Sequence, residues 1–296
     1  MTNPLLQKFS TPYEAVPFDL IKNDHLIPAL KKSIQIALNE IDTIVNQKEE
    51  PSFSNTLVSL DNCGILVSRI SSIIFNLNNA ETSTELQQVS QKAAPLLTQF
   101  QNDIRLNKKL FERIKRVYES TDSNKLSAEE NTLLEKEFRG FVRNGALFSR
   151  KEKEKLREID TKLAQLSLTF GENVLADTQA FSLHIKQEKD LAGLPEDVIE
   201  MAAAIAKQKK LEGWVFTLDY PSYVPFMTYA ENRELRKEMA LAFGKRGFQE
   251  NSQNNIENIK EIIRLRKERA SLLGFSSHAA FVLEERMAKS ENEALQ

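Results

Sequence analysis

The sequence predicts a mainly α-helical fold, a multi-helix lobe with long amphipathic helices and one small antiparallel strand pair. Glycine and proline are scarce, at nine residues each in a chain of 296, which favours helices over a turn-rich β fold. Apolar residues recur at steps of three and four over most of the chain, which is the spacing of helices packed on one face. Several serines are followed three residues later by glutamate, which is the signature of a capped helix start.

The N-terminal part is expected to form an arm followed by two helices. Three prolines within the first nineteen residues predict an extended arm. The first helix should begin near Asn23 or Asp24, either of which can cap it. The second helix should run along one apolar seam from Leu60 to Leu77. Cys63 lies in this seam, where we interpret it as a small buried hydrophobic residue rather than a nucleophile.

Three capping boxes are expected to open the next long helices. They pair Thr82 with Glu85, Ser127 with Glu130 and Ser149 with Glu152. The first of these helices contains Pro95, which should bend or break it. A further helical stretch around 110–118 is followed by a polar loop, so a soft internal boundary is predicted near 120–127. The helix after Ser149 should be the longest, with lysine and glutamate on a solvated face.

Two short segments read as strands. They are Ala180–Ile185 and Gly213–Leu218, which are rich in aromatic and β-branched residues and flank a helix opened by Pro195. We expect them to pair antiparallel. The segment Tyr220–Tyr229 holds two prolines and three tyrosines, and it is predicted to be a rigid corner that braces the strand pair against a helix at Asn232–Phe243. A helix at about Ile256–Leu273 should follow and end at Gly274, and Ser276 or Ser277 should start another.

The composition excludes several classes of function. The formal net charge is −2, which gives no sign of a nucleic-acid or anionic-membrane partner. No apolar run approaches the roughly 20 residues that span a bilayer, and the N-terminus lacks the pattern of a signal peptide. The single cysteine excludes an intramolecular disulfide. These features together predict a cytoplasmic protein.

No catalytic or metal-binding motif is present. His25, His184 and His278 are far apart in the sequence, and there is no H-E-x-x-H, C-x-x-C, Walker loop or G-x-S-x-G. We interpret each histidine as structural. Ser290 and Glu293 form another capping box, and the sequence ends three residues later, in what would be the first turns of a helix. We therefore expect residues 1–296 to be the N-terminal region of a longer protein.

The chain also resembles a known family. The segments that carry the likeness are NPLL, FDLIKNDHLIPAL, PSFSNTLVSLDNCGILVSRISSIIFNL, LAGLPEDVI, LDYPSYVPFMTYAENRELRKEM and ASLLGFSSHAAFVLEERMAKS, in this order. Together they resemble the N-terminal half of the thimet-oligopeptidase family of zinc metallopeptidases. The stretch 52–77 is closer to the peptidyl-dipeptidase branch and 220–229 is also similar to oligopeptidase A, so both branches stay open.

This resemblance implies a helical lobe that walls a channel for short peptide substrates, facing a C-terminal catalytic part of the same protein. It implies zinc in that parent protein, held by an H-E-x-x-H motif that this chain lacks, so the chain itself is expected to bind none and to be inactive alone. No catalytic residue can be carried over. Tyr220, Tyr223 and Tyr229 are the candidates for a side chain facing the peptide channel. The rival hypothesis is a non-catalytic helical scaffold or interaction domain.

Overall fold

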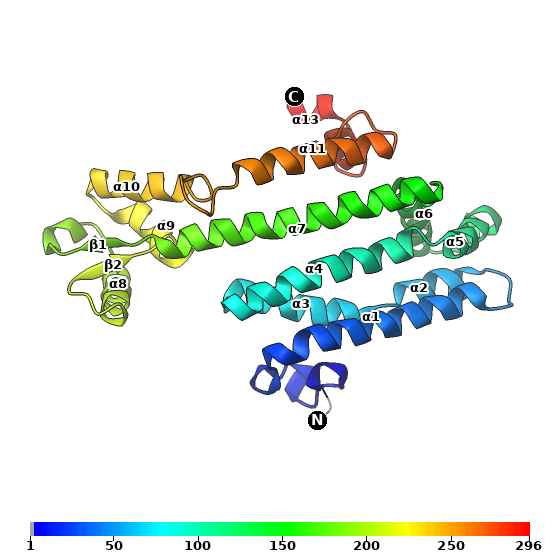
Figure 1. Cartoon of the computed structure of the whole chain (residues 1–296), viewed down its shortest axis with the longest axis horizontal. Helices are drawn as coiled ribbons and strands as arrows, with labels where there is room; N and C mark the ends of the chain where they lie inside the picture. Colours follow the sequence, from blue (N-terminus) through cyan, green and yellow to red (C-terminus); the bar gives the residue numbers. More distant parts are fainter. Residues whose placement is uncertain (1–2) are drawn as a thin grey trace. The chain divides into compact units, whose positions relative to one another are not determined.

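The fold is that of a mainly α-helical chain with a single strand pair, as predicted. The computed structural model describes residues 3–296 (Figure 1). Its strands are β1 (Leu183–Ile185) and β2 (Trp214–Phe216). Its α-helices are α1 (Asn23–Asn46), α2 (Ser59–Asp61), α3 (Ile65–Ala80), α4 (Thr84–Arg105), α5 (Lys108–Ser120), α6 (Ala128–Arg143), α7 (Arg150–Ala180), α8 (Glu196–Gln208), α9 (Tyr220–Tyr229), α10 (Arg233–Gly244), α11 (Ile256–Leu272), α12 (His278–Leu283) and α13 (Glu291–Leu295).

The chain divides into two compact units. The first contains the residues up to Leu168 together with Ile263–Gln296, and the second is Thr169–Ile262. The chain passes between them inside α7 and again inside α11. The segment near 120–127, which the sequence marks as a soft boundary, lies within the first unit and joins α5 to α6.

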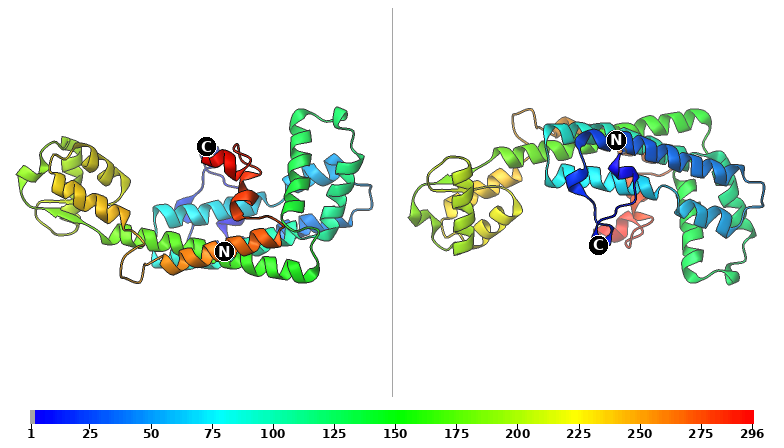
Figure 2. Two further views of the ribbon diagram at one scale, coloured as in Figure 1. Left: turned by 90° about the horizontal axis from the view of Figure 1, so that it is seen from above. Right: turned by 90° about the horizontal axis from the view of Figure 1, so that it is seen from below.

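Two apolar clusters form the core of the first unit. In one, α1, α3 and α4 lie side by side (Figure 1) and bury Leu30, Ile70 and Ala93 completely. In the other, the C-terminal half of α1 meets the antiparallel pair α5 and α6 (Figure 2), with Ile114 and Phe141 fully buried. Each helix therefore turns its apolar stripe inward, as the three- and four-residue spacing predicts.

The predicted second helix is interrupted. Asn62–Gly64 form a turn between α2 and α3, and Gly64 has φ +75°, a left-handed conformation that glycine adopts at little cost. The prediction of one continuous helix was wrong, because the spacing of apolar residues gives no sign that one residue adopts a left-handed backbone conformation. Cys63 lies in this turn, half-buried, and its Sγ lies 3.1 Å from the carbonyl oxygen of Ser59.

The stretch Phe53–Ala80 also corrects the expectation about apolar length. Taken as one helical segment, it is long and apolar enough to cross a membrane by length and composition. Core helices of soluble proteins meet the same criterion. Ile70 and Ile74 of α3 are fully buried in the first cluster, and Gly64 breaks the segment before them.

Most predicted helix caps are confirmed. Ser127 and Glu130 form their reciprocal capping box, with hydrogen bonds of 2.8 and 3.1 Å, and Ser149 and Glu152 do the same at the start of α7. The start of α4 is shifted by one residue from the prediction, because the hydroxyl of Ser83, not Thr82, accepts the N–H of Leu86.

The cap of the first helix needed correction, and of the two outcomes expected at Pro95, a bend or a break, the break does not occur. The first helix is capped one residue earlier than predicted: α1 starts at Asn23 after Lys22, whose backbone N–H donates to Nδ1 of His25. Pro95 does not break α4, which continues to Arg105. Packing against α1 and α3 holds α4 together across the missing hydrogen bond.

The second unit is built on the predicted strand pair. β1 and β2 are antiparallel, with Leu183 opposite Phe216 and Ile185 opposite Trp214. Helix α8 covers the pair (Figure 1) and α9 closes the same core. In this core the ring of Phe226 lies 4.7 Å from that of Phe216. A two-stranded pair needs such packing to be stable.

The segment Tyr220–Tyr229 is itself a helix, which corrects the prediction of a non-helical corner. Pro221 lies in the first turn of α9, where a backbone N–H has no acceptor within the helix, so the N–H that proline lacks is not missed. Ser222 is buried and its hydroxyl accepts the N–H of Thr217 at 2.9 Å, which fixes the helix start against β2. The predicted bracing role is confirmed, since Tyr223 stacks on Phe243 of α10 with ring centroids 4.2 Å apart.

Candidate functional site

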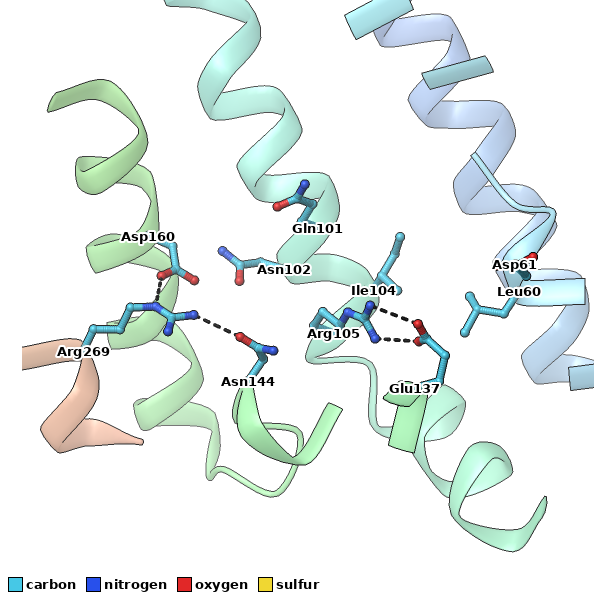
Figure 3. A pocket seen from close by; sticks show the side chains of 10 residues that line it. All are labelled: Leu60, Asp61, Gln101, Asn102, Ile104, Arg105, Glu137, Asn144, Asp160 and Arg269. Atoms are coloured by element: carbon cyan, nitrogen blue, oxygen red, sulfur yellow. Dashed lines mark hydrogen bonds and ion pairs between the residues drawn. The ribbon is translucent and has the colours of Figure 1, made fainter. Parts of the chain in front are cut away.

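One hollow in the first unit is a polar pocket of about 470 Å³. It lies where the end of α4 meets α6, α7 and α11 (Figure 3). Its lining side chains come from distant parts of the sequence, between residues 60 and 269. They are Leu60, Asp61, Gln101, Asn102, Ile104, Arg105, Glu137, Asn144, Asp160 and Arg269.

Two arginine–carboxylate pairs lie on opposite sides of this pocket. Arg105 is paired with Glu137 through two contacts, Nη1 to Oε2 at 2.7 Å and Nη2 to Oε1 at 3.4 Å (Figure 3). Arg269 donates from Nε to Asp160 at 2.7 Å and from Nη2 to the amide oxygen of Asn144 at 3.1 Å. The Arg269–Asp160 pair is the more enclosed, with side-chain exposures of 15% and 16%.

Further contacts hold the arginine of each pair in place. Arg105 is the last residue of α4, where a cation also favours the helix dipole, and its guanidinium lies 4.9 Å from the ring of Phe141. The guanidinium of Arg269 lies 5.1 Å from the ring of Phe281. A pocket of this size with fixed, opposite charges suits the binding of a polar ligand. It contains no cysteine, serine or histidine that could act as a nucleophile or general base.

Sequence reasoning missed this pocket. The Arg105–Glu137 pair spans 32 residues and the Arg269–Asp160 pair spans 109. Within one sequence, these side chains look like other charges on amphipathic helices, and no local spacing signals that they meet. The predicted i,i+4 pairing on the solvated face of α7 does occur, in Arg150–Glu154 at 2.9 Å.

Among residues 3–296 no group of three His, Cys, Asp or Glu side chains is placed to hold a metal ion. The histidines have other contacts: His25 accepts the N–H of Lys22, and Nε2 of His184 lies 2.6 Å from the carbonyl oxygen of Glu212. Burial raises the pKa of Cys63 to about 11, with the charge of Glu40 adding to the effect, so its thiol is not a ready nucleophile.

His278 is the first residue of α12 and lies partly buried. Burial lowers the pKa, and the charges of Arg266 and Arg269 lower it further. The unfolded chain therefore binds a proton more readily than the folded chain, so this residue lowers stability as the pH falls below about 6.5.

We expect the His278→Gln variant to lose less stability than the wild type between pH 7.5 and pH 5.5. Urea unfolding at both pH values measures the difference, and the comparison cancels the carboxylates that titrate in both proteins. A wild type that loses no more stability than the variant would contradict the prediction.

The three candidate tyrosines lie on α9 in the second unit, with different surroundings. Tyr220 is 71% exposed and Tyr229 is 52% exposed. Tyr223 is half-buried in its stack with Phe243. Helix α9 carries no charged residue, so its exposed side offers aromatic and aliphatic surface, including Val224.

The chain is similar in sequence to known peptidases. Residues 226–296 match the model of Peptidase family M3. The whole chain is 33% identical over 301 residues to oligopeptidase A of Haemophilus influenzae and covers 43% of that protein. Over 99% of its length it is 32% identical to dipeptidyl carboxypeptidase of Salmonella typhimurium, again covering 43%. It is also 30% identical over 98% of its length to probable cytosolic oligopeptidase A of Arabidopsis thaliana, covering 42%. The chain thus spans less than half the length of these relatives.

Proposed function

We propose, on the premise that this chain matches the N-terminal part of a thimet-oligopeptidase-family protein, that it is the channel-wall lobe of a longer zinc-dependent oligopeptidase or peptidyl-dipeptidase. The parent protein would hydrolyse short peptides in the cytoplasm. The observation that carries the proposal is similarity along the whole chain to both kinds of peptidase.

The metal-binding side chains in each part of the parent protein decide which part would hold zinc. Residues 3–296 hold no ligand set for zinc, so the metal would be bound by the C-terminal catalytic part of the same protein. In the parent, zinc would supply the Lewis acid for peptide hydrolysis. This chain would form part of the wall of the peptide channel. It would contribute the helices that carry paired charges around the pocket and the uncharged aromatic surface of α9.

We infer that Tyr220 and Tyr229 are the tyrosines that face peptide, because both are exposed, whereas Tyr223 is half-buried in its stack with Phe243; Tyr220 meets the same ring only edge-on, at 6.4 Å. In the parent protein, Tyr220→Ala and Tyr229→Ala should each raise KM for a short fluorogenic peptide about three- to tenfold with a smaller change in kcat, since they remove binding surface and no reacting group. Leu211→Ala, which removes exposed apolar surface outside α9, should leave KM unchanged. Equal effects of all three substitutions would contradict this assignment.

The chain alone should neither retain stoichiometric zinc nor cleave peptides. Metal analysis after dialysis and a quenched-fluorescent peptide assay test both expectations, with the parent protein as the positive control. Chelator-sensitive turnover by the chain alone would overturn the division of labour. A parent protein without peptidase activity would instead favour a non-catalytic scaffold.

A further inference from the structure

A second hollow in the first unit is lined by cationic side chains. It has a volume of about 300 Å³ and lies between the end of α1, the segment at Pro51 and the first turns of α5. Four of its seven lining residues are cations and one is an acid. The lining residues are Val45, Pro51, Lys108, Lys109, Glu112, Arg113 and Arg116.

Arg113 forms the buried wall of this hollow and has no carboxylate partner within 4 Å among the described residues. It is 9% exposed. Its Nη1 donates to the carbonyl oxygen of Glu49 at 3.3 Å, and its Nη2 donates to Asn55 Oδ1 at 3.2 Å and lies 3.5 Å from Thr56 Oγ1. All three acceptors are neutral, and Nε has no hydrogen-bond partner among the described residues. A buried charge without a carboxylate in direct contact is costly, and burial lowers the pKa of Arg113 although the charges of Glu50 and Glu49 act in the opposite direction.

The start of α5 carries the wrong charge for a helix. Lys108 and Lys109 are its first two residues, and its first turn has no acidic residue. Cations at a helix N-terminus oppose the macrodipole and destabilise the helix. Asn107 caps the helix by accepting the N–H of Leu110, which leaves the N–H groups of Lys108 and Lys109 without an acceptor in the helix.

The nearby carboxylates compensate for this charge only in part, because the charges of Glu50 and Glu49 raise the pKa of Arg113 by less than burial lowers it. Glu50 lies 3.5 Å from Arg116, on the exposed rim, and Glu112 is the only acid in the lining. Lys109 reaches only the amide oxygen of Asn46, at 3.5 Å. Lys153, close enough to Lys108 for their charges to interact, donates to the carbonyl oxygen of Leu106 rather than to an acid. The hollow therefore keeps an excess of positive charge.

We propose that this hollow is an anion site that binds a phosphate group, held by Lys108, Lys109 and Arg113 at the N-terminus of α5. A phosphate dianion would supply the counter-charge that the buried guanidinium lacks, and it would reverse the unfavourable charge at the helix start. A guanidinium beside two ammonium groups and free helix N–H groups is the donor set that tetrahedral oxyanions prefer. The ligand is either free inorganic phosphate or the terminal phosphate of a nucleotide, and the site is independent of the proposed peptidase activity.

Thermal unfolding of the chain, followed by circular dichroism, tests the proposal. Sodium phosphate should raise Tm by about 2–4 °C more than sodium chloride at the same pH and ionic strength. The Lys108→Gln/Lys109→Gln variant should lose this increment, and calorimetric titration with inorganic phosphate should show about tenfold weaker binding. The Lys115→Gln/Lys136→Gln variant removes the same charge from α5 and α6 outside the hollow, and it should keep the increment.

The arms of the experiment separate the two sources of phosphate. ATP that binds at least about tenfold more tightly than inorganic phosphate identifies a nucleotide, whereas inorganic phosphate that binds as tightly as ATP identifies the free anion. Equal protection by acetate, or equal loss in the two double variants, would overturn the proposal. Both variants change only exposed lysines or a half-buried one, so their helical spectra provide a direct check that they are folded.

Discussion

Replacing Phe226 with alanine should lower the free energy of unfolding of the second unit by about 3–5 kcal/mol, the cost of removing a fully buried aromatic ring. Phe226 is completely buried on the inner side of α9, and its ring packs on Phe216 of β2. The pair joins the only strands of the described residues to the helix that follows them. The cavity left by the ring would loosen this junction, because a short two-stranded pair has little stability of its own.

The single tryptophan makes the effect easy to measure. Trp214 lies in β2, so its fluorescence during urea unfolding reports on the second unit. The matched control is Val224→Ala, which shortens an exposed side chain on the same helix and should change stability by less than about 0.5 kcal/mol. Similar losses in both variants would mean that α9 is not held by its buried side.

Gly193→Ala should have the other large effect, about 2–5 kcal/mol, on the same unit. Gly193 has φ +86°, a conformation that costs alanine about 1–2 kcal/mol. A Cβ there would lie 2.2 Å from the carbonyl oxygen of Tyr229, a backbone atom that cannot rotate away. The clash would strain the adjacent hydrogen bond from the N–H of Glu231 to the carbonyl of Ala192, now 2.9 Å long, and displace the end of α9.

A second glycine supplies the control. Gly171 lies within α7, and a Cβ built there meets no atom within 4 Å. Gly171→Ala should therefore stabilise the protein by about 0.5–1 kcal/mol, because alanine loses less backbone freedom than glycine in a helix. Chemical denaturation of the two variants should move in opposite directions. A neutral Gly193→Ala would show that the 190–194 turn can rearrange.

Local signals predicted the regular parts of this fold well. The sequence alone locates the capping boxes at Ser127 and Ser149 and the apolar faces of α1 and α4, because each of these patterns involves residues only a few positions apart. The register of Leu183 opposite Phe216 is consistent with the predicted strand pair. Such features depend on covalent spacing, which a single sequence contains.

The errors arose where one residue or a tertiary contact decides the structure. Gly64 interrupts a perfect apolar seam through a single left-handed conformation. In α9, burial of Ser222 and Phe226 stabilises a helix in a segment whose two prolines predict none. The candidate site depends on long-range pairs such as Arg269–Asp160, and the proposed anion site depends on Arg113 meeting only neutral acceptors from residues 49–56. Neither can be read from residue spacing.

The insertion of one unit within the other has a consequence for biosynthesis. Asp160 leaves the ribosome 109 residues before its partner Arg269, and the whole of Thr169–Ile262 is made in the interval. All residues of the second unit have therefore emerged while the first unit still lacks residues 263–296. Non-local closure is slow, and domains tend to fold as units during synthesis. We expect arrested nascent chains that carry residues 1–262, followed by an unstructured linker long enough to fill the ribosomal exit tunnel, to show a protease-resistant second unit although α11 is incomplete.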